Sequence, residues 1–337
     1  MNEYLTLIVP LFDRHELTHR VLYSLNEQKC EFKIIVADGS FQKWNQKEEE
    51  YKNLDIDYFY DGSDVNIQKF MEKMGRASKR IETPLCMIFD NDDIIDLSGI
   101  RNGIKFMSNN PEYSCYQNDV RTLDVYPELN LRESLYQNNS VEDESPAERL
   151  DDVIRNFNSF NYAIFRSSYI KSFFSMLDIL DNDDFQFFQK SWAYTSAILG
   201  KCKRLQNESY YYFIPGDSTI QDGKIHKFSR WADTRYWAKS CPRIISTISN
   251  LYEHLYGSDE KIRERFARSF MDEIIKRANY DYPEDFDNYI KAICDLSLNY
   301  DEKAKEAVSG FFIDRDTFEY SCDEKANHEE FLKCLST

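Results

Sequence analysis

The chain has little glycine, little proline and no long apolar run. Of its 337 residues only 10 are glycine and 8 are proline, whereas 24 are phenylalanine and 23 are tyrosine. This composition supplies enough aromatic and apolar material for a sizeable core, so we expect little disorder over most of the length. No apolar run approaches the roughly 18 residues of a transmembrane helix, so the sequence predicts no membrane span.

Several sequence signatures are also missing. No two of the eight cysteines form a Cys-x-x-Cys pair, so a zinc site of ordinary spacing is not expected. Neither Gly-x-Gly-x-x-Gly nor a Walker loop follows the first predicted strand, which removes the main support for a dinucleotide-binding or P-loop protein. Met1-Asn2-Glu3-Tyr4 lacks the basic region of a signal peptide. We therefore expect a cytoplasmic protein whose cysteines, such as Cys86 and Cys115, are buried free thiols.

Positive charge is scarce as well. The sequence has 42 basic and 59 acidic residues, which gives a formal net charge of −17. General nucleic-acid binding and binding to anionic membranes both require a basic surface, so we expect neither. An anionic small substrate would need a local basic patch or a metal ion to overcome this background.

Residues 1–120 alternate between predicted strands and predicted helices. Leu17, Val21 and Leu25 recur at four-residue spacing and predict a helix with one buried face, and a second such helix is predicted over 66–81. This order predicts an α/β protein with an open, mostly parallel sheet flanked by helices. The apolar runs that predict its strands lie at 5–10, 33–37, 56–60 and 85–89.

The sequence after residue 120 completes the α/β domain and then becomes purely helical. Residues 120–160 are polar and acidic and predict an excursion or loop, whereas 216–223 predict a mobile loop. Beyond residue 235 only helical spacing remains, so we predict one α/β domain over 1–235 and a helical accessory region over 236–337. Between the two loops we expect a strand at 162–166, a helix after Asp184 and a strand at 209–215. The apolar positions of the last region are Ile262, Phe266, Phe270, Ile274, Tyr289, Ile293 and Leu296.

The most informative stretch is the strand at 85–89 followed by Asp90-Asn91-Asp92-Asp93. Parallel strands deliver ligand-binding groups at their carboxyl ends, so Asp90 and Asp92 are expected to emerge together there. A hard divalent ion that bridges the two carboxylates to a diphosphate is the simplest chemistry for this pair. A solvated acidic turn is the alternative. We expect Asp93 to cap the following helix, with support of the metal site as its alternative role.

Four motifs occur in one order along the first hundred residues: Leu7-Ile8-Val9-Pro10-Leu11-Phe12-Asp13-Arg14, Ser24-Leu25-Asn26-Glu27-Gln28, Ile34-Ile35-Val36-Ala37-Asp38-Gly39-Ser40 and Phe89-Asp90-Asn91-Asp92-Asp93. Together they resemble the family 2 glycosyltransferases of the GT-A fold, over about 1–215. The resemblance implies a metal-dependent, inverting glycosyltransferase that uses a nucleotide sugar, most simply a UDP-sugar, with Mn²⁺ or Mg²⁺. Asp13 and Ala37 depart from the residues typical of the family, which leaves the nucleotide base open.

The resemblance implies a base pocket and a diphosphate site, both in the nucleotide-sugar-binding half of the domain, residues 1–120. Pro10, Leu11 and Phe12 would line the base pocket, and Asp38 would accept a hydrogen bond from the base. A turn is the alternative reading of Asp38-Gly39-Ser40.

Asp90 and Asp92 would face the ribose and the metal-bound diphosphate, with Asp92 the more direct metal ligand. Four basic residues share one helical stripe, and Arg76 is the one expected to contact the donor diphosphate. A solvated basic face is the alternative for the others. The stripe consists of Lys69, Lys73, Arg76 and Arg80.

The family also places a catalytic base in the acceptor half, 121–235. By position Asp184 would take the proton of the acceptor hydroxyl, and Asp183 stands where the family has glutamate. A helix N-cap is the alternative for this pair. His226, which follows the predicted mobile loop, would be an additional metal ligand, with an exposed histidine as its alternative.

The resemblance further implies a glycan or lipid-linked acceptor in bacterial surface polysaccharide synthesis. The sequence leaves two further properties open: whether the protein attaches peripherally to the inner membrane face, and whether it forms a homo-oligomer. Two rival functions remain. A catalytically silent glycan- or nucleotide-binding protein is one, because Asp13 and Ala37 depart from the family. A sugar nucleotidyltransferase is the other, although residues 10–15 lack the glycine-rich loop that such enzymes need.

Overall fold

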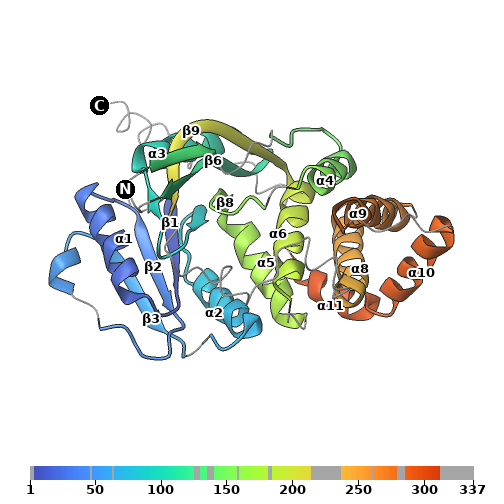
Figure 1. Cartoon of the computed structure of the whole chain (residues 1–337), viewed down its shortest axis with the longest axis horizontal. Coiled ribbons are helices and arrows are strands. Elements are labelled where there is room, and N and C mark those ends of the chain that lie inside the picture. The colour runs from blue at the N-terminus through green and yellow to red at the C-terminus, as the bar shows by residue number, and fades with distance from the viewer. Residues whose placement is uncertain are drawn as a thin grey trace.

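The computed structural model describes residues 4–45, 48–62, 64–124, 130–134, 140–157, 159–180, 184–213, 237–259, 261–278 and 285–311. Within these residues the chain is an α/β structure in which nine strands form a single sheet that helices flank (Figure 1). None of the described helices is both long and apolar enough to span a membrane.

The sheet is mixed, and its N-terminal half is entirely parallel. The strand order is β3-β2-β1-β4-β8-β6-β9-β5, with β7 paired to β6. The strands β3, β2, β1 and β4 are parallel, β6 and β9 are parallel, and the remaining pairs are antiparallel. The predicted α/β class and sheet are thus confirmed. The strands are β1 (Leu5–Leu11), β2 (Lys33–Asp38), β3 (Asp55–Tyr60), β4 (Leu85–Ile88), β5 (Ile94–Ile95), β6 (Tyr113–Asp124), β7 (Asn130–Ser134), β8 (Ile164–Arg166) and β9 (Lys201–Phe213).

Alternating side chains of the central strands supply a core on each face of the sheet, because successive residues of a strand point to opposite sides. Ile8 of β1 packs into the core that α2, α5 and α6 complete. Leu7 and Val9 belong to the other core, which α1 and α3 complete. These helices are α1 (His15–Glu27), α2 (Ile67–Lys79), α3 (Leu97–Asn109), α5 (Ser167–Ile179) and α6 (Phe185–Leu199).

The carboxyl ends of β1, β2 and β4 meet at one edge of the sheet. Leu11, the last residue of β1, lies opposite Asp38, the last residue of β2. On the other side of β1, the amide of Phe89 donates to the carbonyl of Ile8 over 3.1 Å. The order β2-β1-β4 makes this the point at which the chain reverses its direction of winding, where open α/β sheets bind ligands.

The expectation of a loop over 120–160 is wrong. This segment contains the end of β6, the strand β7 and the helix α4 (Pro146–Arg155). Ser145 caps α4 by accepting from the amide of Glu148, and Pro146 occupies its first turn. This Ser-Pro-x-Glu pattern is a helix-start signal, which the polar composition of the segment obscured. The expected strand at 209–215 is the end of the longer β9.

The described residues beyond 236 are almost all helical, as predicted. Figure 1 shows their helices at the opposite end of the molecule from α1. The predicted face of α9, from Ile262 to Ile274, is buried, whereas Leu296 of α10 is 47% exposed and does not belong to the core. The predicted boundary at residue 235 stays a prediction. The helices are α8 (Trp237–Tyr256), α9 (Ile262–Ala278), α10 (Phe286–Leu298) and α11 (Asp301–Ser309).

Polar contacts attach these helices to the rest of the chain and to one another. Asp301 accepts from Arg263 over 2.8 Å and from Ser246 over 2.7 Å, so one carboxylate joins α8, α9 and α11. The Tyr256 hydroxyl donates to the carbonyl of Ile198 at the end of α6, a helix terminus whose carbonyls lack intrahelical partners. The buried Arg149 of α4 donates to the neighbouring carbonyl of Ala197 over 2.7 Å.

Candidate functional site

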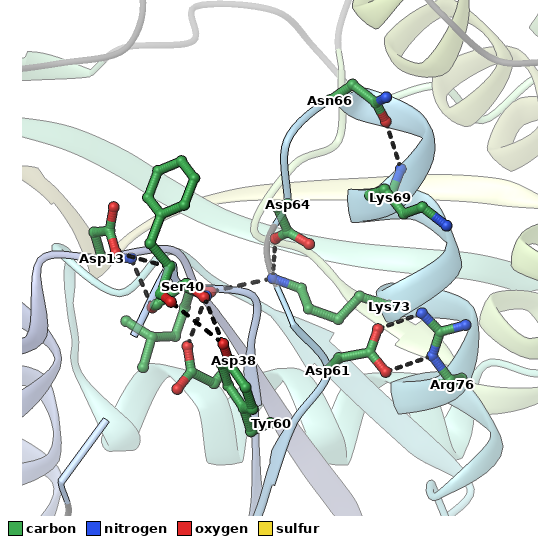
Figure 2. Close-up of polar contacts among 12 residues, drawn as sticks. Asp13, Asp38, Ser40, Tyr60, Asp61, Asp64, Asn66, Lys69, Lys73 and Arg76 are labelled. Atoms are coloured by element: carbon green, nitrogen blue, oxygen red, sulfur yellow. Dashed lines mark hydrogen bonds and ion pairs between the residues drawn. The ribbon is translucent and has the colours of Figure 1, made fainter. Parts of the chain in front are cut away.

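Asp38 organises the loop that follows β2 (Figure 2). Its fully buried carboxylate accepts from the amide of Ser40 over 2.9 Å, the amide of Trp44 over 3.0 Å and the hydroxyl of Tyr58 over 2.7 Å. Burial and the neighbouring carboxylate raise the pKa of Tyr58, which keeps its hydroxyl a donor. Asp38 therefore shapes the turn, and its hydrogen bond to a nucleotide base stays a prediction.

Gly39 is required by a close approach between this loop and the segment after β3. A Cβ at Gly39 would overlap the carboxylate of Asp64. That carboxylate pairs with Lys73 of α2, whose amine also donates to the carbonyl of Leu11 over 3.1 Å. Because both groups are buried, the pKa of Lys73 is lowered and that of Asp64 is raised. A buried cation thus lies at the carboxyl end of β1 (Figure 2).

Arg76 lies one helical turn further from this point and is paired with Asp61, as Figure 2 shows. The guanidinium makes two hydrogen bonds to that carboxylate, one of them over 2.7 Å. The predicted contact of Arg76 with a donor diphosphate stays a prediction and would have to share this guanidinium with Asp61. Among the basic stripe, Lys73 is the residue that reaches the end of β1.

Aromatic rings flank the Asp38 loop. The ring centroids of Phe12 and Phe41 lie 5.5 Å apart, and Phe41 is 64% exposed. Together they provide an aromatic surface of the kind on which a planar base stacks. Pro10 is partly exposed, whereas the side chain of Leu11 is fully buried and its carbonyl accepts from Gly39 and Lys73.

Three carboxylates gather at the carboxyl end of β4. Ligand oxygens of Asp90, Asp92 and Asp93 all lie within 4.8 Å of one another. Burial, and then the charge of Asp92, raises the pKa of Asp90 to about 6. Burial also raises the pKa of Asp92, although Arg14 opposes this effect. Two carboxylates so close together and so little hydrated favour a proton or a cation between them.

This cluster fits a divalent metal ion. Its donors are carboxylate oxygens, which Mg²⁺ and Mn²⁺ prefer, and they lie at the carboxyl end of a parallel strand. Asp93 is fully buried within the cluster. The expectation that Asp93 caps the next helix is wrong, because Asp96 caps α3 by accepting from the amide of Ser98 over 2.9 Å.

Residues from distant parts of the chain hold the cluster in place. Arg14 donates to the carboxylate of Asp92 over 2.8 Å, and Arg20 of α1 donates to the backbone carbonyl of the same residue. The hydroxyl of Tyr162 donates to the carboxylate of Asp90 over 2.9 Å. Each aspartate of the Asp-x-Asp motif therefore has a partner that the motif itself does not reveal.

The backbone of both partner segments is strained. Among the described non-glycine residues with positive φ are Asp13 (50°) and Arg14 (56°), and likewise Phe160 (47°) and Tyr162 (65°). Such conformations are uncommon for bulky side chains and cluster at functional sites. Here they aim Arg14 and Tyr162 at the aspartates.

The turn that carries Tyr162 is itself held by the second half of the sheet. The buried side chain of Gln117 in β6 donates to the carbonyl of Asn161. Arg204 of β9, which is also buried, donates to the oxygen of Gln117 over 3.1 Å. The strands β6 and β9 thus contribute to the site by fixing this turn.

Asp184 has the structure of a helix cap. One of its carboxylate oxygens accepts from the amide of Gln186 over 2.9 Å at the start of α6, and the other accepts from the hydroxyl of Ser240 in α8. The first turn of α6 packs against the first turn of α2, with ring centroids of Phe70 and Phe188 6.5 Å apart. Asp184 therefore lies toward the same edge of the sheet as Lys73. Asp183 and His226 lie outside the described residues.

Sequence reasoning missed Arg14, Arg20 and Tyr162. Arg14 lies inside a motif that was recognised, but its role depends on a left-handed turn that cannot be predicted from the residue types at Asp13 and Arg14. Tyr162 is 72 positions from Asp90, so only the sheet topology brings them together. Lys73 had a local signal, since it belongs to the basic stripe.

Comparison with known proteins finds structures of similar fold. The sequence matches no protein-family model and no curated protein. Among solved structures, residues 1–349 of TarS from S. aureus match with a TM-score of 0.50 and 13% identity over 93% of each chain. The same fragment in complex with UDP-GlcNAc matches with a TM-score of 0.49 and 14% identity over 91% of each chain. The first of these matches shows that the chain shares the overall fold of this TarS fragment.

Proposed function

We propose that the protein is a metal-dependent, inverting glycosyltransferase that transfers a sugar from a nucleotide-sugar donor, a UDP-sugar in the first instance. The observation that carries this proposal is the cluster of Asp90, Asp92 and Asp93 at the carboxyl end of β4. It lies at the edge where an open α/β sheet binds ligands, in a chain that shares the fold of the TarS fragment and whose motifs resemble family 2 glycosyltransferases.

The donor would lie across the ends of β1, β2 and β4. Phe12 and Phe41 offer the base a stacking surface next to the Asp38 loop. Asp92 and Asp90 would hold Mn²⁺ or Mg²⁺, with His226 as a further ligand. The bound metal would supply positive charge for the leaving diphosphate, which the strongly acidic chain otherwise lacks. Lys73 adds a buried positive charge at the end of β1.

Asp184 would accept the proton of the acceptor hydroxyl. In a single displacement, the acceptor oxygen then bonds to the anomeric carbon while the bond from that carbon to the diphosphate breaks. Gln186 and Ser240 hold both carboxylate oxygens in a fixed orientation, which suits a positioned base. Asp183 would help to orient the site.

The acceptor is proposed to be a glycan or a lipid-linked precursor of a bacterial surface polysaccharide. The reaction would take place in the cytoplasm, and attachment to the inner membrane face would bring a lipid-linked acceptor within reach. The helices α8–α11 would serve as the accessory region, in assembly or in placing the acceptor. The acceptor and the location rest on the resemblance of the sequence motifs, whereas the accessory role of the helices rests on their position beyond the region of resemblance.

A screen of nucleotide sugars for metal-dependent hydrolysis tests the proposal. We expect at least one UDP-sugar to be hydrolysed in the presence of Mn²⁺ and to raise the melting temperature, since a ligand that binds the folded state stabilises it. The Asp92→Asn variant should lose both effects, whereas Asp96→Asn, which removes a nearby carboxylate outside the cluster, should keep them. Binding without hydrolysis or transfer in the wild type would instead identify a silent nucleotide-binding protein.

A further inference from the structure

Arg14 occupies an unusual position at the junction of β1 and α1. It is the N-cap residue of α1, yet its φ of 56° and ψ of 43° are left-handed and its side chain makes no capping bond. The preceding Asp13 is left-handed as well. Such a conformation costs on the order of 1 kcal/mol for each residue with a Cβ atom, and glycine would avoid the cost.

The strained turn points the guanidinium of Arg14 at Asp92. The two side chains form an ion pair of 2.8 Å in which they are 27% and 13% exposed. The pair is therefore neither fully hydrated nor fully buried. In such a setting a charge-assisted hydrogen bond stabilises the structure more than a fully exposed ion pair does. The contact takes up an oxygen of the aspartate that the proposed function makes the more direct metal ligand.

We propose that Arg14 is a tethered counter-ion of Asp92, which a divalent metal ion must displace from the carboxylate. This inference rests on the proposed function, because it requires that the aspartate cluster binds a metal. Without the metal, the guanidinium neutralises Asp92 beside Asp90 and Asp93. The metal and the guanidinium compete for the same oxygen, so Arg14 sets the metal affinity of the site below its intrinsic value.

The competition also makes metal binding depend on the nucleotide diphosphate. A site with an internal cation holds a free metal ion weakly, so tight binding would require the additional ligands that a diphosphate provides. The phosphates then become part of the metal site instead of entering a completed one. The metal and the nucleotide diphosphate should accordingly bind with strong positive coupling, each raising the affinity for the other.

Mn²⁺ titration without nucleotide, followed by the Mn²⁺ electron paramagnetic resonance signal, tests the proposal on the full chain. The variants are Arg14→Gln and Arg14→Lys, which both keep a Cβ at the left-handed position and so share its backbone strain. Arg101→Gln is the matched control, because Arg101 pairs with Glu31 over 2.6 Å in a comparable environment and that carboxylate is not part of the cluster. Melting temperatures confirm that each variant is folded.

Arg14→Gln should bind Mn²⁺ about tenfold more tightly than the wild type, the order expected for loss of a competing charge-assisted pair. It should also show weaker coupling between Mn²⁺ and UDP. Arg14→Lys should stay close to the wild type because it keeps the charge, and Arg101→Gln should match the wild type.

Equal or weaker Mn²⁺ binding by Arg14→Gln would overturn the inference, as would equally tight binding by Arg14→Lys and Arg14→Gln. Both results leave the proposed function standing if the wild type binds Mn²⁺. Failure of the wild type and of all variants to bind Mn²⁺, with or without UDP, would instead contradict the proposed function.

Discussion

Two acidic sites lie at the same edge of the sheet, and their surroundings differ. The aspartates after β4 share a small volume, do not cap a helix, and have partners on strained turns. Asp184 begins α6 with an ordinary capping bond and a hydroxyl partner. The cluster has no evident value for stability, because neighbouring carboxylates repel each other. Asp184 would be useful to the fold whether or not it takes part in catalysis.

This contrast gives the two sites unequal support as parts of an active site. The geometry of Asp90, Asp92 and Asp93 favours a proton or a cation between the carboxylates, so it points to a ligand site without help from a motif. Asp184 indicates function only through its place on the edge and the resemblance of its motif. Experiments that separate stability from chemistry are therefore most useful at Asp184.

The largest expected effect belongs to Asp184→Asn. Asparagine keeps the size and the capping bond but cannot accept a proton, so glycosyl transfer should fall by roughly 10²–10⁴-fold while donor binding persists. Asp183→Asn should cost less if that residue only orients the site. Steady-state transfer and thermal melting on the same samples give the comparison. A variant that transfers at a near-normal rate and is merely less stable, by about 1 kcal/mol, would leave Asp184 with only its capping role.

A smaller effect is expected for Tyr162→Phe, which removes one hydroxyl from the aspartate cluster. Asp90 loses the hydrogen bond that lowers its pKa, so its ionised form becomes less stable and Mn²⁺-dependent binding of UDP should weaken by about tenfold. Calorimetry measures this effect. Tyr256→Phe is the control, because its hydroxyl donates to Ile198 and not to a carboxylate. Equal affinities of the two variants would show that Tyr162 does not position Asp90.

The stability of the metal-free protein should depend on Asp90 through pH. Its pKa is about 6 in the folded chain and near 3.9 in an unfolded one, so the folded state binds more protons between these values. Stability from this group is therefore present below about pH 4 and is lost as the pH rises to about 6, by about 1 kcal/mol after allowance for partial exposure.

Urea unfolding between about pH 4 and pH 6, with a chelator present to remove metal ions, measures how the free energy of unfolding changes with pH. The same measurement on Asp90→Asn gives the comparison. The asparagine variant cannot titrate at this position and should lack the contribution. Identical pH profiles for the two proteins would show that Asp90 is not perturbed by its neighbours.

The smallest effect is expected at a purely structural cap. Ser145→Ala removes the acceptor for the amide of Glu148 at the start of α4 and should cost about 0.5–1 kcal/mol of stability. UDP binding should not change, since α4 is not part of the site. Thermal melting and calorimetry check both statements. A marked loss of binding would mean that α4 contributes to the site.

The sequence motifs were sufficient for the parallel half of the sheet. The apolar runs that became β1, β2, β3 and β4 are short and bounded by turn residues, and two helices with clear spacing connect them. Because parallel strands end at a common edge, the position of Asp90 and Asp92 followed directly. Local pattern and global fold agree in this part of the chain.

Local pattern failed where structure depends on distant contacts. The strands β6 and β9 are long and pair parallel with each other, and they depend on that distant pairing, so only the end of β9, at 209–213, was predicted as a strand. The helix α4 was hidden in an acidic segment in spite of its cap. The roles of Arg14 and Tyr162 depend on left-handed backbone conformations, for which the sequence has no reliable signal.

The central claim is that the aspartate cluster binds a divalent ion together with a nucleotide diphosphate. Calorimetric titration of UDP with and without Mn²⁺ tests it on the wild type, Asp92→Asn and Asp96→Asn. We expect Mn²⁺ to strengthen UDP binding to the wild type and to Asp96→Asn, and to have no effect on Asp92→Asn, which should remain folded. Unchanged Mn²⁺-dependent affinity in Asp92→Asn would contradict the claim.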